Sequence, residues 1–152
     1  MPLGYTLGKL TQAGAELNLI GQGLERMRHY WGEFQSYFDY ILDLGDSLMQ
    51  PTEHDNLLFD DGAFSRSRRY FWAIDCLTEF DINITDNITQ WELYKAARID
   101  PLEGLLPELD RRQLAIAEQQ CIVLQNQRDS FRQKLASTRA LRDAVGKCSL
   151  VM

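Results

Sequence analysis

The sequence predicts an all-α protein in which three long antiparallel helices form a coiled-coil-like bundle. Apolar residues recur at alternating steps of three and four over three long segments, which is the spacing of a helix face that packs on another helix. Proline and glycine gather between these segments, and no segment is a convincing candidate for a β-strand. The chain of 152 residues is long enough for one domain with a core, so we expect a single domain over residues 1–152.

A first helix is expected over residues 10–49. Pro51 ends it, because proline cannot continue the hydrogen-bond ladder and disfavours helical geometry at the residue before it. Gly14 and Gly21 lie inside this helix and are expected to let a neighbouring helix approach closely. The apolar seam, with Gly45 in its one gap, consists of Leu17, Ile20, Leu24, Met27, Trp31, Phe34, Phe38, Ile41 and Leu48.

Residues 50–64 form the first expected connection. Three apolar residues indicate that it packs onto the bundle, and one histidine lies among three aspartates that invite comparison with a cation site. Their spacing fits neither an EF-hand loop nor a zinc motif, so we favour a solvated or capping loop and predict no metal ligand. The residues concerned are Leu57, Leu58 and Phe59, and His54, Asp55, Asp60 and Asp61.

A second helix is expected over residues 65–99. Its seam consists of Tyr70, Ile74, Leu77, Ile84, Ile88 and Trp91, with Phe80 and Tyr94 alongside. Asp81 occupies a seam position between two apolar residues. Two roles are open for its carboxylate: a contact with a cation, or an ion pair with Arg128 or Lys134 of the third helix, since a carboxylate at a helix boundary needs a partner.

The start of this helix, "SRSRRYFWAID", joins basic residues to three consecutive aromatic rings. Tyr70, Phe71 and Trp72 point about 100° apart on a helix, so they do not form one flat platform for nucleic-acid bases. Acidic residues further along the segment are unlike the basic polar face of a membrane-surface helix. We therefore expect the rings to pack in the bundle while Arg66, Arg68 and the neighbouring arginine stay outside.

Residues 100–106, with Pro101 and Gly104, form the second connection, and a third helix is expected over residues 107–146 before a short tail over 147–152. Pro107 suits a first helical turn, and Glu108 and Asp110 complement the positive end of the helix dipole. The seam contains polar residues, so we expect this helix to be more stalk-like than core-like. The seam reads Leu114, Ala117, Cys121, Leu124, Arg128, Phe131, Leu135, Thr138, Arg142 and Val145.

The sequence offers no catalytic constellation. It has two histidines in different parts of the chain and none of the motifs of hydrolases, zinc proteases or nucleotide-binding loops. We therefore predict no enzyme activity, no cofactor and no metal site. Three cysteines without a CxxC pair favour reduced thiols and a cytoplasmic location. No window reaches the roughly 18 apolar residues of a membrane span, so direct membrane insertion is not expected.

Three blocks of the chain carry a resemblance to a known family. The strings "SRSRRYFWAI", "DNITQWELY" and "FRQKLASTRALRDA" resemble the cytosolic helical region of fungal CorA-like proteins, relatives of the CorA magnesium channel family, over about residues 50–145. The residues that carry the resemblance are Arg68, Tyr70, Phe71, Trp72, Trp91, Phe131 and Leu135.

The resemblance implies that the third helix is the stalk of a pentameric channel. In the family that helix continues into a transmembrane span with a Gly-x-Asn motif, whereas this sequence reads "LRDAVGKCSLVM". We therefore expect a truncated or degenerate relative that forms no pore, and no ion-site residue is transferred to it.

The expected function is helix-mediated association without catalysis, either with a second copy of the chain or with a full-length CorA-like transporter. The protein would be cytoplasmic, or membrane-associated through that partner. The alternative is a free-standing helical scaffold or adaptor unrelated to ion transport. A third hypothesis, an RNA-binding surface on residues 66–72, is opposed by the net charge of −6 and the pI of about 4.9.

Overall fold

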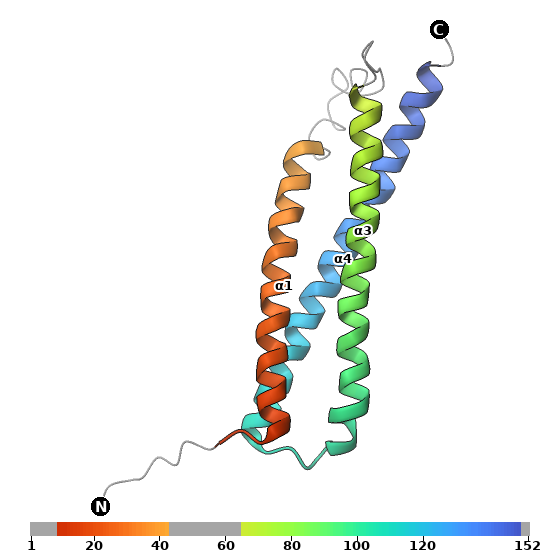
Figure 1. The fold of residues 1–152 in the computed structure, drawn as a ribbon. Helices are drawn as coiled ribbons and strands as arrows, with labels where there is room; N and C mark the ends of the chain where they lie inside the picture. The colour runs from red at the N-terminus through yellow and green to blue at the C-terminus, as the bar shows by residue number, and fades with distance from the viewer. Residues whose placement is uncertain (1–8, 43–64, 150–152) are drawn as a thin grey trace, which may run out of the picture.

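The computed structural model describes residues 9–42 and 65–149. It consists of three long helices, α1 (Gln12–Leu42), α3 (Ser65–Tyr94) and α4 (Glu108–Ser149), and the described residues contain no strand. Helices α1 and α4 run in one direction and α3 runs in the other (Figure 1). The predicted all-α bundle of three long helices is confirmed, while coiled-coil-like packing stays a prediction.

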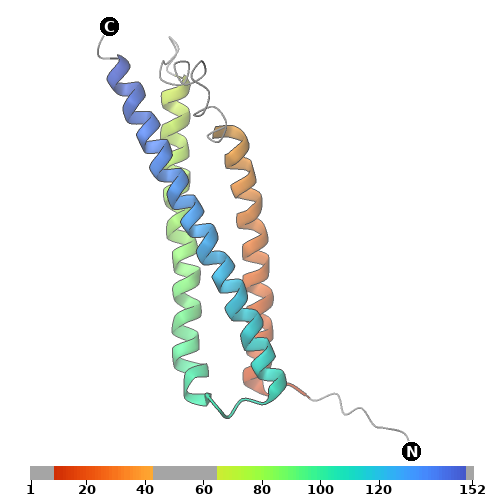
Figure 2. The same ribbon diagram turned by 180° about the vertical axis from the view of Figure 1, so that it is seen from behind.

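Helix α4 lies at the centre of the bundle. Both α1 and α3 pack along it, whereas the backbones of α1 and α3 rarely approach one another. Helix α4 crosses the pair diagonally, beginning beside α1 and ending beside α3 (Figures 1 and 2). We expected α4 to be less of a core element than the other two helices. Instead it carries the surface on which both of them bury their apolar side chains.

The face of α1 that packs on α4 differs from the predicted seam. Leu17, Leu24 and Phe38 are buried as expected, but Met27 and Phe34 are exposed. At two other seam positions the buried residue is the one that follows the predicted residue, since Gly21 and Leu42 are buried while Ile20 and Ile41 are half-buried. Gly14, one turn before Leu17, also joins the buried set. The predicted seam therefore combined two neighbouring faces of one broad apolar surface. Leu48, its last member, lies outside the described residues.

The seams of α3 and α4 agree closely with prediction. Every predicted apolar seam residue of α3 is buried, and Ala73 joins them. On α4, Leu114 is half-buried, while Thr138 is fully buried and donates its hydroxyl to the Lys134 carbonyl oxygen at 2.8 Å. That bond satisfies the hydroxyl within its own helix. The buried apolar set of α4 is Ala117, Cys121, Leu124, Phe131, Leu135, Leu141 and Val145.

The helix boundaries shift by a few residues from those predicted. Helix α1 begins at Gln12 rather than at residue 10. Residues 43–64, over which the sequence predicts the end of the first helix and the first connection, lie outside the described part. Helix α4 begins at Glu108, after the carbonyl of Pro107 accepts the Arg111 N–H at 3.0 Å. It continues to Ser149, three residues into the expected tail.

The end of α3 contains two irregular turns. A π-helical turn over Lys95–Ile99 is followed by a 3₁₀ turn over Asp100–Leu102. The wide turn is closed by the Asp100 N–H, which donates to the Lys95 carbonyl oxygen. Pro101 has no N–H with which to extend an α-helix, so the regular ladder ends here. Gly104 then adopts a φ of +79°, a left-handed conformation that suits glycine, and turns the chain toward α4.

A buried polar contact joins the beginnings of α1 and α4. Thr11 precedes the first helical residue of α1, and its hydroxyl oxygen accepts the Gly14 N–H at 3.3 Å, as an N-cap does. Asp110 of α4 is fully buried and accepts hydrogen bonds from the Thr11 N–H, at 3.3 Å, and from the Thr11 hydroxyl. A Cβ atom on Gly14 would lie 2.1 Å from the Asp110 Oδ1 atom, so only glycine fits beside this carboxylate.

Candidate functional site

The best candidate for a functional site is an apolar groove between α1 and α3. Its volume is about 350 Å³. The α1 wall consists of Ile20, Gly23, Leu24 and Met27. The α3 wall consists of Asn87, Gln90, Trp91 and Tyr94. The groove exists because α1 and α3 both rest on α4 and remain apart from each other, so side chains alone line the space between them.

The α1 wall belongs to a second seam, which we call the outer seam and define as Ile20, Gly23, Met27, Tyr30, Phe34, Tyr37 and Ile41. These residues follow one another at steps of three and four, the spacing of a helix face that packs on another helix. Four of them remain exposed, with exposed fractions of 37% for Met27, 59% for Tyr30, 44% for Phe34 and 53% for Tyr37. The outer seam therefore has the pattern of an interface but lies largely open to solvent.

A cluster of aromatic rings joins the helices beyond the groove, toward the C-terminal end of α1. The Phe80 ring of α3 lies 5.3 Å from that of Trp31, 5.0 Å from that of Phe34 and 5.4 Å from that of Phe38. Phe131 of α4 completes the cluster, with its ring centroid 5.6 Å from that of Phe80. Edge-on ring contacts of this kind add to the apolar burial and join all three helices.

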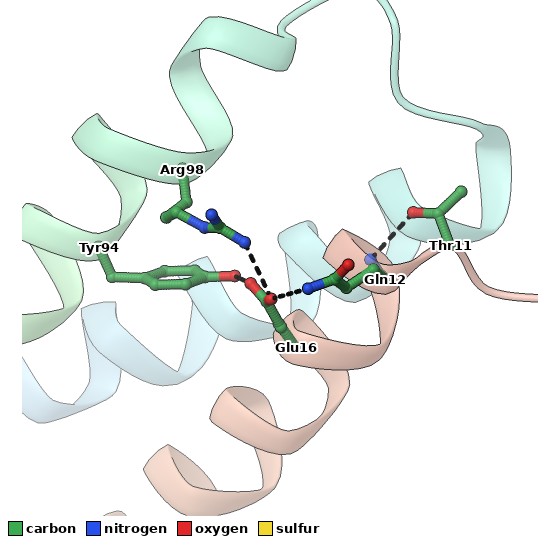
Figure 3. A network of polar contacts seen from close by, with 6 residues as sticks. Thr11, Gln12, Glu16, Tyr94 and Arg98 are labelled. Carbon is green, nitrogen blue, oxygen red and sulfur yellow. Dashed lines mark hydrogen bonds and ion pairs between the residues drawn. The ribbon is translucent and has the colours of Figure 1, made fainter.

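A polar network lies at the opposite end, beyond the groove residue Tyr94 (Figure 3). The Tyr94 hydroxyl donates to the Glu16 Oε2 atom at 2.8 Å, and the Arg98 guanidinium donates to the Oε1 atom at 3.0 Å. Gln12 donates a third bond to the same carboxylate at 3.2 Å. These contacts join the first turns of α1 to the π-helical turn after α3. A second ion pair, between the Lys95 Nζ and Glu118 Oε1 atoms at 2.7 Å, joins that turn to α4.

The network changes the acidity of two of its members. The hydrogen bond from Tyr94, followed by that from Gln12, lowers the pKa of Glu16 below its ordinary value of 4.5. Burial, reinforced by the bond to Glu16, raises the pKa of Tyr94 to about 12. Both pKa shifts favour an ionised Glu16 carboxylate and a neutral Tyr94 phenol. These are the protonation states in which the Tyr94 hydroxyl can donate its hydrogen bond to Glu16. At neutral pH the network is therefore fully formed.

The basic-aromatic cluster that stands out in the sequence is divided among three environments. Tyr70 is buried in the core, whereas the Trp72 ring stacks on Phe38 of α1 with centroids 5.5 Å apart and planes at 8°. The Phe71 ring carries the Arg142 guanidinium of α4 at 5.6 Å. Arg68 is exposed. The expectation that all three rings pack inside the bundle is correct only for Tyr70, because Phe71 and Trp72 are 55% and 46% exposed. The three rings do not form a common stacking platform.

The other signature residues lie in the core or at its boundary. Trp91 is buried while its side chain also lines the groove, and Phe131 and Leu135 are buried on α4. The predicted partner of Asp81 was wrong. The Asp81 Oδ1 atom lies 2.5 Å from the Nε atom of Arg132. In the bundle, Arg132 is the basic residue of α4 that lies level with Asp81 on α3.

Sequence reasoning missed several residues of the groove and of the outer seam. Gly23, Tyr30, Tyr37, Asn87 and Gln90 were not proposed as site residues. Gly23, Tyr30 and Tyr37 belong to the outer seam, a second set of α1 residues spaced by three and four. The predicted seam mixed members of this set with members of the set that packs on α4. The two amide side chains on α3 carried no signal of their own, since isolated asparagine and glutamine residues are common on helix surfaces.

The described residues show no group of three or more histidine, cysteine or acidic side chains arranged to hold a metal ion. The histidine and aspartates of the first connection lie outside the described part. Within residues 9–42 and 65–149, none of the helices is both long and apolar enough to cross a membrane. Cys121 is buried and Cys76 is half-buried, and burial raises the pKa of both thiols.

The chain was compared with models of protein families, with curated proteins and with solved structures, and none of them matches it. The resemblance of three sequence blocks to CorA-like proteins therefore remains a prediction.

Proposed function

We propose that this chain is a non-catalytic association module that binds an apolar helix in the groove between α1 and α3. The observation that carries the proposal is the outer seam of α1, which has the spacing of a helix–helix interface and is largely open to solvent. A small ligand would contact only one or two of these residues. The outer seam instead extends over six successive steps of three or four residues, from Ile20 to Ile41.

Two further features support a helix as the bound group. The groove is uncharged along its floor and both walls, since it is lined by apolar residues, glycine and two amide side chains. Charged groups lie beyond its end, where the Glu16 carboxylate of α1 accepts hydrogen bonds from Tyr94 and Arg98. An apolar groove lined by side chains suits a helix better than an extended strand, which would need exposed backbone partners.

The partners that we propose are a second copy of the chain or a full-length CorA-like transporter, with the protein located in the cytoplasm or held at a membrane through that partner. The resemblance of the sequence blocks supports the transporter as partner. A free-standing scaffold or adaptor would use the same groove for a different helix, so the identity of the bound chain separates the two hypotheses.

The experiment that tests the proposal places a photoactivatable phenylalanine analogue at Met27, on the groove wall. Ile122 is the matched control, because it is exposed to a similar degree on α4. The variant chains are irradiated alone and together with a full-length CorA-like transporter. We expect a covalent adduct with a second polypeptide from position 27 and none from position 122. The absence of any adduct from position 27 would contradict the proposed function.

A further inference from the structure

We infer that the groove is filled by α1 of a second copy of this chain, with the two outer seams antiparallel and Met27 opposite Tyr30 of the second copy. This inference rests on the proposed function and names its partner and its register. In this register Ile20 lies opposite Tyr37 of the second copy, and Gly23 lies opposite Phe34. Each contact occurs twice, because a twofold axis relates the two copies.

The sizes of the side chains are complementary in this register. Gly23 lines the groove, and no atom lies within 4 Å of the position that a Cβ atom on Gly23 would occupy. The bulky Phe34 ring, which is 44% exposed, would enter the open space beside Gly23 of the second copy. A large side chain packed into the gap left by a small one is the arrangement that buries the most apolar surface without steric overlap.

The charges beside the seam are complementary in the same register. Arg26 and Glu33 precede Met27 and Phe34 by one position, so they lie on the same flank of the outer seam, and both are exposed. In the antiparallel pair, Arg26 of each copy lies beside Glu33 of the other. Within its own chain Glu33 pairs only with His29, whose Nε2 atom is 3.4 Å from the Glu33 Oε1 atom among the described contacts. The flank also brings the exposed Leu19 beside Tyr40 of the second copy.

A parallel arrangement would lose both features. Each residue would then lie opposite itself, so Gly23 would face Gly23 and leave a void, while Phe34 would collide with Phe34. The other flank of the outer seam cannot supply compensating charges, because it consists of Leu24, Trp31 and Phe38. Leu24 and Phe38 are buried, and Trp31 is packed against Phe131 with ring centroids 6.1 Å apart. Only the antiparallel register pairs opposite charges and large with small side chains.

Charge reversal tests this register directly. The wild-type chain, Arg26→Glu, Glu33→Arg and the double variant are compared by sedimentation equilibrium at low ionic strength, where exposed ion pairs have their largest effect. Each single variant replaces two attractive contacts by two repulsive ones, so we expect dimer dissociation constants to rise about tenfold. The double variant restores opposite charges and should dimerise like the wild type. Helicity by circular dichroism is the folding control, since both side chains are exposed.

The possible results separate this inference from the proposed function. Weakening by each single change together with rescue by the double change supports the antiparallel pair. A wild-type chain that stays monomeric, single changes without effect, or a double variant without rescue would overturn it. If position 27 still cross-links to a different polypeptide in those cases, the groove binds a helix, but not α1 of a second copy.

Discussion

Replacing Gly14 by alanine is expected to destabilise the bundle, although alanine is the better helix former. The added Cβ atom would lie 2.1 Å from the Asp110 Oδ1 atom and 2.5 Å from its Cγ atom, so the carboxylate must move. Asp110 is fully buried, and movement would break the bonds that it accepts from the Thr11 N–H and hydroxyl. The loss therefore falls on a charged group that has no water to replace its partners.

The magnitude follows from two opposing contributions. Each hydrogen bond to a buried charged group is worth about 1.5–3 kcal/mol, and exchanging glycine for alanine within a helix gains about 1 kcal/mol. The two lost bonds therefore outweigh the gain, and the net loss is about 2 kcal/mol or more. In a chain of this length such a loss lowers the melting temperature by about 4–8 °C.

Gly23 supplies the matched control on the same helix. No atom lies within 4 Å of its Cβ position, so Gly23→Ala should instead stabilise the chain by about 0.5–1 kcal/mol. Both variants are measured by urea denaturation at low protein concentration in an Arg26→Glu background, which weakens association between copies. Adding Asp110→Ala to Gly14→Ala should remove the penalty for the methyl group. A neutral or stabilising Gly14→Ala variant would refute this reasoning.

Three further predictions concern the aromatic cluster, the polar network and the surface ion pair. Phe131→Ala should cost about 3–5 kcal/mol of unfolding free energy in urea denaturation, because the ring is fully buried among those of three helices; a cost below 1 kcal/mol would contradict this packing. Tyr94 has its pKa raised from 10.0 to about 12, so its contribution to stability is complete below pH 10 and is lost as the pH rises through 12. Glu16 has a lowered pKa, so its contribution is present above pH 4.5 and is lost as the pH falls through the folded value. Tyr94→Phe should abolish the alkaline loss and move the Glu16 titration, followed by NMR, back toward 4.5; an unchanged Glu16 titration would count against the network. Asp81→Ala should cost less than about 1 kcal/mol, because its ion pair with Arg132 is partly exposed, and a larger loss in denaturation would show that the pair acts as a buried one.

Much of the fold could be predicted from the sequence because helix-forming information is local. The three-and-four spacing located all three helices, and the seams of α3 and α4 were correct because each has one narrow apolar face. On α1 the apolar surface is broad, so the same rule permits two adjacent seams. The seam that packs on α4 includes Gly14 and Gly21, whose small size favours close contact but adds nothing to an apolar pattern.

The candidate site was less predictable because it depends on how the helices are arranged. The groove arises from the separation of α1 and α3 across α4, which no local pattern records. Likewise, the pairing of Asp81 with Arg132 depends on the relative height of two helices. The π-helical turn at Lys95–Ile99 follows from the nearby Pro101 and from contacts of that turn with α1 and α4, so only its position before a proline could have been anticipated.

The central claim is that the groove between α1 and α3 is the surface by which two copies of this chain associate, and light scattering of the wild-type and Gly23→Trp chains tests it most directly. No neighbouring group lies within 4 Å of a Cβ atom at position 23, and Gly23 lines the groove of about 350 Å³, so we expect an indole there to occupy the groove. We predict that the mass of the wild-type chain rises from 17.6 kDa toward twice that value with increasing concentration, while Gly23→Trp remains folded at 17.6 kDa. A wild-type mass of 17.6 kDa at every concentration, or equal association of the two chains, would contradict the claim.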